Sequence, residues 1–184
     1  MAQKWRMARY NTENKRAALD QQGLRDLALT YVGRFATTRT RLMLYLRRKL
    51  RERGWGGEGE PDLDALIARL CELGYVDDGA YARMKGAAMG RRGIGAGRVR
   101  AALSADGVAE TDRAEAEEDA RAGRWDAADI LARRKRIGPY GAEPAHDPLQ
   151  RERQIAMFIR AGHDMATARA WVDAAPGAFP ERSE

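Results

Sequence analysis

Three glycines each stand four positions after an apolar residue, and these pairs recur along the chain at almost equal intervals. The pairs are Leu50/Gly54, Leu103/Gly107 and Phe158/Gly162, with first members 53 and then 55 residues apart. Glycine favours the backbone conformation that ends an α-helix, so each pair predicts a helix C-terminus. Repeats of this size cannot bury a sufficient core alone and stack on their neighbours, which predicts a serial, elongated body.

Apolar residues between these glycines follow the 3.6-residue period of amphipathic helices, and strand-like alternation is nowhere sustained. Nine helices are predicted, three for each glycine pair. They cover residues 24–35, 38–53, 63–71, 79–92, 99–106, 109–122, 127–137, 148–161 and 166–174. We therefore expect an all-α fold of three tandem three-helix repeats, spanning 24–76, 77–123 and 124–175. A basic disordered arm (1–23) and a tail (176–184) flank them.

The net charge of +6 conceals an alternation of basic and acidic bands along the chain. Residues 1–57 carry +10, 58–82 carry −6 and 83–100 carry +6, followed by −6 over 101–129 and +4 over 130–136. In an elongated repeat protein these bands become separate basic patches, which suit a polyanion or an acidic protein surface.

The candidate binding residues are arginines and lysines of the three basic bands. They are Arg39, Arg41, Arg47, Arg48 and Lys49; Arg91, Arg92, Arg98 and Arg100; and Arg133, Arg134, Lys135 and Arg136. In the first group only Glu52 offsets the charge of the helix, and like charges at i and i+4 repel. A bound polyanion would relieve that repulsion, which favours a functional use over a merely solvated face.

Other polar features favour structural interpretations. The stretch from Gly93 to Gly97 admits a phosphate-binding loop, but it lacks a nucleotide fingerprint and a preceding strand, so an inter-helix turn is preferred. The acidic run at 115–119 is a solvated helix face or a surface for a basic partner. Trp55, Trp125 and Trp171 are packing anchors, with base stacking as the alternative.

The composition excludes several classes of function. No apolar run is long enough to cross a membrane, and the N-terminus lacks the apolar stretch of a secretion signal. Cys71 falls on an apolar helix face, while His146 and His163 fit cap or solvent roles, so we expect no disulfide, metal site, cofactor or catalytic group. A cytoplasmic monomer that is not an enzyme, and that does not bind membranes, fits these observations.

The central block carries a resemblance to a known family. Leu73-Gly74-Tyr75-Val76-Asp77-Asp78, Arg91-Arg92-Gly93-Ile94-Gly95 and Arg98-Val99-Arg100 are similar to segments of the RecX family. The match extends upstream to the run from Tyr45 to Leu50 and downstream through 125–141 and 155–162, covering about residues 24–175. Tyr45 replaces a usual acidic residue, Ile94 a usual aromatic one, and Ala101-Ala102-Leu103 lacks a common glutamate.

The resemblance implies an all-helical, curved protein that binds the filament of the RecA recombinase on single-stranded DNA, and duplex DNA more weakly. It implies a negative regulator that limits filament growth, ATP hydrolysis, strand exchange and repressor cleavage. It leaves open whether binding is along the filament groove or at its growing end. From the basic helices and glycine turns alone, a helix-turn-helix regulator of duplex DNA is the alternative.

Overall fold

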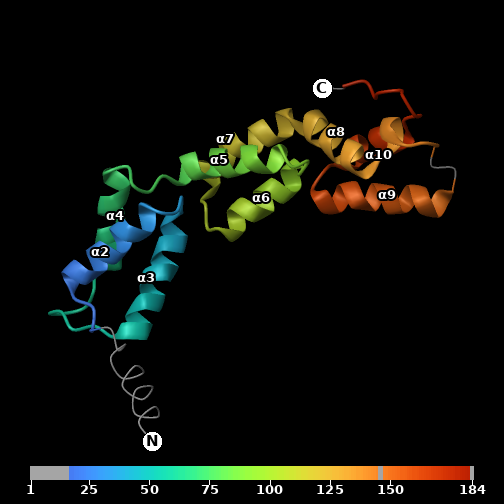
Figure 1. The fold of residues 1–184 in the computed structure, drawn as a ribbon. Helices are drawn as coiled ribbons and strands as arrows, with labels where there is room; N and C mark the ends of the chain where they lie inside the picture. Colours follow the sequence, from blue (N-terminus) through green and yellow to red (C-terminus); the bar gives the residue numbers. More distant parts are fainter. Residues whose placement is uncertain (1–16, 145–146, 183–184) are drawn as a thin grey trace, which may run out of the picture. The chain divides into compact units, whose positions relative to one another are not determined.

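The structure is a computed structural model that describes residues 17–144 and 147–182. These residues form nine α-helices and one short 3₁₀ helix, and the single β-bridge among them joins Leu19 to Trp55. The predicted all-α class is therefore confirmed. The chain divides into two compact units, unit 1 up to Asp77 and unit 2 from Asp78 (Figure 1).

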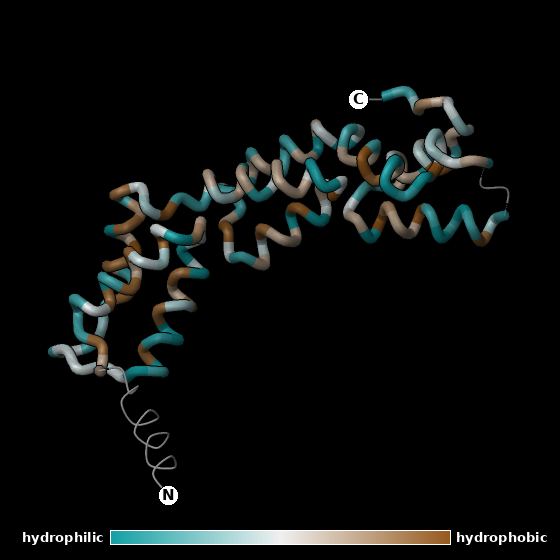
Figure 2. The backbone as a smooth tube through the Cα atoms, viewed as in Figure 1, coloured by the Kyte–Doolittle hydropathy of each residue, from teal (hydrophilic) through white to brown (hydrophobic). Residues whose placement is uncertain are grey.

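Unit 1 contains three helices, α2 (Gln21–Val32), α3 (Arg39–Arg53) and α4 (Leu63–Glu72). Each begins after a polar side chain that accepts a hydrogen bond from a free backbone N–H of the first turn: Asp20, Thr38 and Asp62, respectively. Along α3, apolar and polar residues alternate in Figure 2, as expected for a helix with one buried face. Leu42 and Leu46 form that face and are fully buried against residues of α2 and α4.

The segment preceding α2 is part of unit 1 from residue 17 onward. Leu19 is buried, its N–H donates to the Gly54 carbonyl (3.0 Å), and its own carbonyl accepts from the Gly56 N–H (2.9 Å). Arg53 also donates to the carbonyl of Ala17. Residues 17–23, which the sequence assigned to a disordered arm, are thus ordered, while residues 1–16 lie outside the described residues.

Unit 2 contains six α-helices with two apolar cores. α5 (Asp78–Gly90), α6 (Ala96–Ala105) and α7 (Glu110–Ala122) surround a core that includes Val99 and Leu103. α8 (Arg124–Lys135), the 3₁₀ helix η1 (Gly138–Tyr140), α9 (Pro148–Ala161) and α10 (Met165–Asp173) surround a second core around Phe158 and Trp171. The organisation into three repeats and the boundaries of those repeats stay a prediction.

The three recurring glycines end helices as their spacing predicts. Gly54, Gly107 and Gly162 all have positive φ, at 79°, 76° and 94°. At Gly107 and Gly162 the next residue's N–H donates back to the repeat's apolar residue, from Val108 to Leu103 and from His163 to Phe158. This is the hydrogen bond of a Schellman helix end, so the sequence spacing reflects a shared local geometry.

The predicted tail is described up to Arg182, and these residues pack on unit 2. The Gly177 N–H donates to the Pro139 carbonyl (2.9 Å), and the rings of Phe179 and Tyr140 meet edge to face. Arg182 pairs with Asp126 at 2.8 Å. Among the described helices, none is long and apolar enough to span a bilayer.

Candidate functional site

The turn between α5 and α6 exposes two of the predicted arginines. α5 ends at Gly90, and the chain reverses through Gly93, which has φ +77°. The N–H groups of Arg92 and Ile94 both donate to the Met89 carbonyl, and Ile94 packs partly buried against the core of α5 to α7. The side chains of Arg91 and Arg92 are left exposed.

The same turn is packed against the end of α9. The N–H of Gly95 donates to the Ala161 carbonyl (2.9 Å), and that of Gly97 to the Gly162 carbonyl (3.0 Å). A Cβ atom on Gly95 would collide with the Gly162 backbone, so the close approach requires glycine. Because the fold itself uses these two N–H groups, the inter-helix turn is confirmed and the phosphate-loop alternative is not supported.

His163 lies beneath this turn and not in solvent. It is 5% exposed, and its Nε2 atom lies 3.2 Å from the carbonyl oxygen of Gly93. Burial lowers the pKa of His163, partly opposed by this hydrogen bond and by the charge of Asp164. The sequence predicted either a helix cap or a solvent-exposed side chain for His163. The solvent-exposed interpretation is wrong, whereas the backbone N–H of His163 does cap the end of α9. His146 lies outside the described residues.

The basic end of α8 meets the basic end of α5. Arg133, Arg134 and Lys135 occupy the last turn of α8, where the helix dipole favours cations, and Arg136 follows in the left-handed conformation. The guanidinium of Arg134 donates from Nη1 to the carbonyl oxygen of Arg92 at 2.9 Å. The second and third basic bands are therefore adjacent, although the sequence predicted them to be separate patches.

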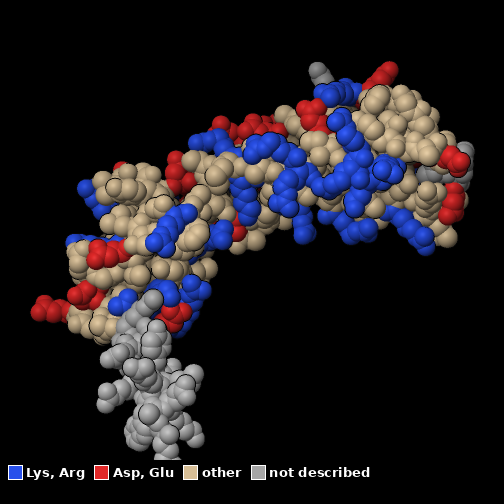
Figure 3. All heavy atoms as spheres, in the orientation of Figure 1, with Lys and Arg blue, Asp and Glu red and all other residues tan. Residues whose placement is uncertain are grey.

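We call this combined region the basic junction. It contains the exposed side chains at the end of α5, the start of α6 and the end of α8, namely Arg91, Arg92, Arg98, Arg133, Arg134, Lys135 and Arg136. Arg98 belongs to it because its backbone abuts Gly162, directly beside the glycine turn. In Figure 3, lysine and arginine atoms gather on the face of unit 2 that is in view.

Not every predicted cation is equally available for binding. Arg133 pairs with Asp129 (3.1 Å) and lies over the Tyr140 ring, and the hydrogen bond to Tyr140 together with the charge of Asp129 raises its pKa. Arg100 is exposed but lies about 200° around α6 from Arg98, so the two do not share a face. Arg83 and Lys85, from the same band, pair with Glu115 and Asp106.

The first basic group lies on α3 in unit 1. Arg39, Arg41, Arg47 and Arg48 are exposed, whereas Lys49 is half-buried. Glu52 pairs with Lys49 at 2.5 Å and with Arg48 at 3.6 Å, which offsets part of the charge. Arg39 and Arg47 line a groove between α3 and α4, a feature that no single-helix pattern revealed.

Tyr45, one of the departures from the family pattern, has a packing role. Its ring stacks on Tyr31 with centroids 4.2 Å apart, and the cationic groups of Arg48 and Lys49 lie over it within 6 Å. An aromatic residue thus holds the basic side chains at a position where the family usually has an acidic one.

The structural interpretations of the remaining features agree with the observed packing. On α7, the exposed Glu118 pairs with Arg121 (2.8 Å), as expected for a solvated face, whereas Glu117 is half-buried and pairs with the half-buried Arg113 (2.7 Å). Trp125 and Trp171 are buried core residues, and the half-buried Trp55 donates to the Gly59 carbonyl. Cys71 packs half-buried against the core of unit 1. Over the described ranges, no group of three or more metal-ligating side chains occurs.

Fold and surface together define an all-helical protein that presents clustered arginines at helix ends. No family model matches the chain. It is, however, 32% identical over 160 residues to "Regulatory protein RecX" of Myxococcus xanthus (strain DK1622), covering 83% of this chain and 86% of that protein. The chain belongs to the RecX family.

Two solved structures share the fold. The crystal structure of RecX from Lactobacillus salivarius has a TM-score of 0.61 at 17% identity, covering 80% of this chain and 90% of that one. A second crystal structure, of regulatory protein RecX, has a TM-score of 0.61 at 20% identity, covering 91% of this chain and 77% of that one. Both support the helical architecture described above.

Proposed function

We propose that this protein is a negative regulator of the RecA recombinase that binds the RecA filament on single-stranded DNA. The observation that carries the proposal is membership of the RecX family, at 32% identity over most of the chain. The RecX resemblance implies a RecA-binding regulator, and the exposed basic residues supply a physical means of binding a nucleoprotein surface.

The basic junction is the main contact region in this proposal. A guanidinium presents a planar fork of N–H donors that matches phosphate and carboxylate oxygens alike. Arg91 and Arg92 project from a turn anchored by backbone hydrogen bonds, so they reach a partner with little loss of backbone entropy. The α3 side chains Arg39, Arg41, Arg47, Arg48 and Lys49, together with Arg100, supply further contacts.

Regulation follows from binding alone. The protein acts as a cytoplasmic monomer without cofactor or chemical step, prefers single-stranded to duplex DNA, and limits filament growth, ATP hydrolysis, strand exchange and repressor cleavage. The helix-turn-helix alternative has no comparable support, because the relative that is 32% identical over most of the chain is a RecX protein.

The test is the rate of ATP hydrolysis by the cognate RecA on single-stranded DNA, with this protein titrated in. We expect the rate to fall at stoichiometric or lower ratios to RecA. An unchanged rate at saturating ratios, with RecA active in the control, would contradict the proposal.

A further inference from the structure

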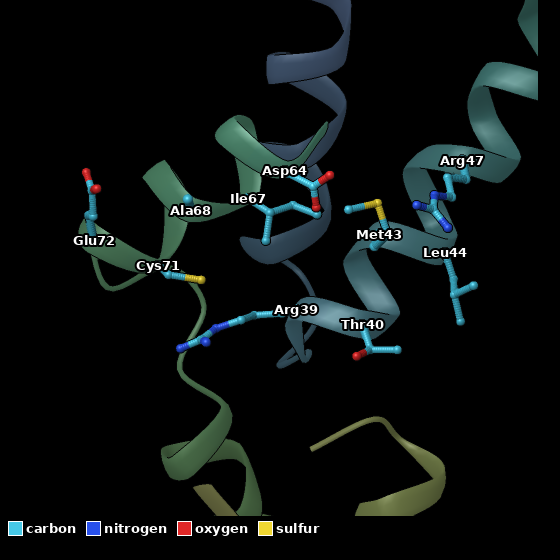
Figure 4. A pocket seen from close by; sticks show the side chains of 10 residues that line it. All are labelled: Arg39, Thr40, Met43, Leu44, Arg47, Asp64, Ile67, Ala68, Cys71 and Glu72. Atoms are coloured by element: carbon cyan, nitrogen blue, oxygen red, sulfur yellow. The ribbon is translucent and has the colours of Figure 1, made fainter. Parts of the chain in front are cut away.

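A groove with a volume of about 660 Å³ runs between α3 and α4 in unit 1 (Figure 4). The residues that form its α3 wall recur every three or four positions, so they lie on one face of that helix, and the α4 wall is formed in the same way. The lining residues are Arg39, Thr40, Met43, Leu44, Arg47, Asp64, Ile67, Ala68, Cys71 and Glu72.

The centre of the groove is apolar. Ile67 and Met43 point toward one another in Figure 4, and Met43 and Cys71 are only partly covered by the core of unit 1. Leu44 stands at the edge with 59% of its surface exposed, two positions from both Leu42 and Leu46 of the buried face. Solvent exposure of Met43, Leu44 and Cys71 costs free energy that a docked apolar surface would recover.

The two rims carry opposite charges. Arg47 stands on the α3 side, whereas Asp64 and Glu72 come from α4, two helical turns apart. The side chain of Arg39 extends from α3 toward Cys71 at one end of the groove (Figure 4). A phosphate backbone lying here would meet two carboxylates along one rim. An amphipathic helix avoids that conflict, because its two flanks can carry different charges on either side of an apolar face.

We propose that this groove docks an amphipathic helix of a partner protein, with apolar side chains at i, i+3 or i+4 and i+7, carboxylates toward α3 and basic groups toward α4. The inference rests on the proposed function, in which the protein carrying that helix is RecA. Unit 1 then supplies the protein contact, whereas the basic junction of unit 2 supplies contacts to the nucleic acid.

Two variants test the groove from opposite walls. Leu44→Asp removes the exposed apolar edge, and Ala68→Arg fills the groove from α4, where Asp64 and Glu72 at i−4 and i+4 favour the new side chain. The matched control is Leu29→Asp, because Leu29 is an exposed leucine (44%) that lines a different groove, between α2 and α4. Circular dichroism and thermal melting check that all three variants keep the helical fold.

Fluorescence anisotropy of the labelled full-length protein measures affinity for RecA filaments on single-stranded DNA and for the bare strand. We expect both groove variants to lose about tenfold or more in filament affinity. Leu44→Asp should bind the bare strand within about twofold of Leu29→Asp, because the two variants carry the same charge change, and Ala68→Arg, which adds a positive charge, should bind the strand at least as tightly as the unmodified protein.

The outcomes separate the inference from the proposed function. If the unmodified protein does not bind filaments, the proposed function fails and this inference fails with it. If it binds and both groove variants bind equally well, only the groove assignment is overturned. A dimer of the unmodified protein that Leu44→Asp converts to a monomer would also overturn it, because the groove would then hold a second copy.

Discussion

Arg134 and Arg92 are joined by a hydrogen bond from a guanidinium to a main-chain carbonyl, 2.9 Å long, across 42 residues of sequence. The bond places the cationic end of α8 beside the cationic turn after α5. Two groups of arginines that an acidic helix separates in the sequence thereby form one surface.

The first prediction concerns the charge of this surface. Reversing Arg92 to glutamate removes an exposed cation but keeps the carbonyl that Arg134 binds. We expect affinity for single-stranded DNA to fall by on the order of tenfold at low salt. The salt slope should become shallower by about 0.7 for each phosphate that the variant no longer neutralises. Anisotropy over a salt series measures both quantities.

Arg69→Glu is the control for that experiment, because Arg69 is an exposed arginine of α4 in unit 1 outside the candidate groups. It makes the same change in net charge. Equal affinity and equal salt slope for the two variants would show that the basic junction is only a solvated face.

The second prediction concerns the packing of the glycine turn. In Gly95→Ala the new methyl group meets the Gly162 backbone, which cannot move without disturbing the end of α9. We expect the free energy of unfolding to fall by about 1–3 kcal/mol, as for other overpacked sites, and denaturant unfolding measures the change. Gly90→Ala is the control, since a Cβ there meets no atom within 4 Å; it should be neutral or slightly stabilising.

The third prediction concerns pH. Burial lowers the pKa of His163 from its ordinary value of 6.5. Between that value and the folded-state pKa, the histidine is protonated in the unfolded chain but neutral in the folded protein. Stability from this group is complete above pH 6.5 and falls as the pH drops from there toward the folded-state pKa, by at most about 1.4 kcal/mol per pH unit. Unfolding of the protein and of His163→Gln from pH 7.5 to 5 measures this. The variant should show a shallower loss, and identical slopes would exclude His163 as the cause.

Local signals account for much of the fold. Helix ends were predictable because the positive φ at Gly54, Gly107 and Gly162 favours glycine. The exposure of Arg39, Arg47 and Arg48 follows from their positions on α3, away from the face that buries two leucines. The contact between Arg134 and Arg92, the burial of His163 under Gly93, and the groove between α3 and α4 were not predictable. Each of these contacts depends on how helices that are distant in the sequence pack together. The residues that neighbour them along the chain carry no signal of that packing.

The fourth prediction concerns overall dimensions. Serial stacking of three repeats predicts an elongated, curved monomer, so the radius of gyration should exceed the roughly 16 Å of a compact globule of 184 residues. Small-angle scattering with a parallel mass measurement tests this. A value at the globular limit would contradict the serial arrangement.

The most direct test of regulation by the basic junction is the growth rate of RecA filaments on single-stranded DNA, followed by the fluorescence of labelled RecA with the protein added. We expect the unmodified protein to slow growth, and Arg91→Glu/Arg92→Glu, folded to the same extent, to need a higher concentration for the same effect. Growth unaffected by the unmodified protein, or slowed equally by the double variant, would contradict the claim that the basic junction regulates the filament.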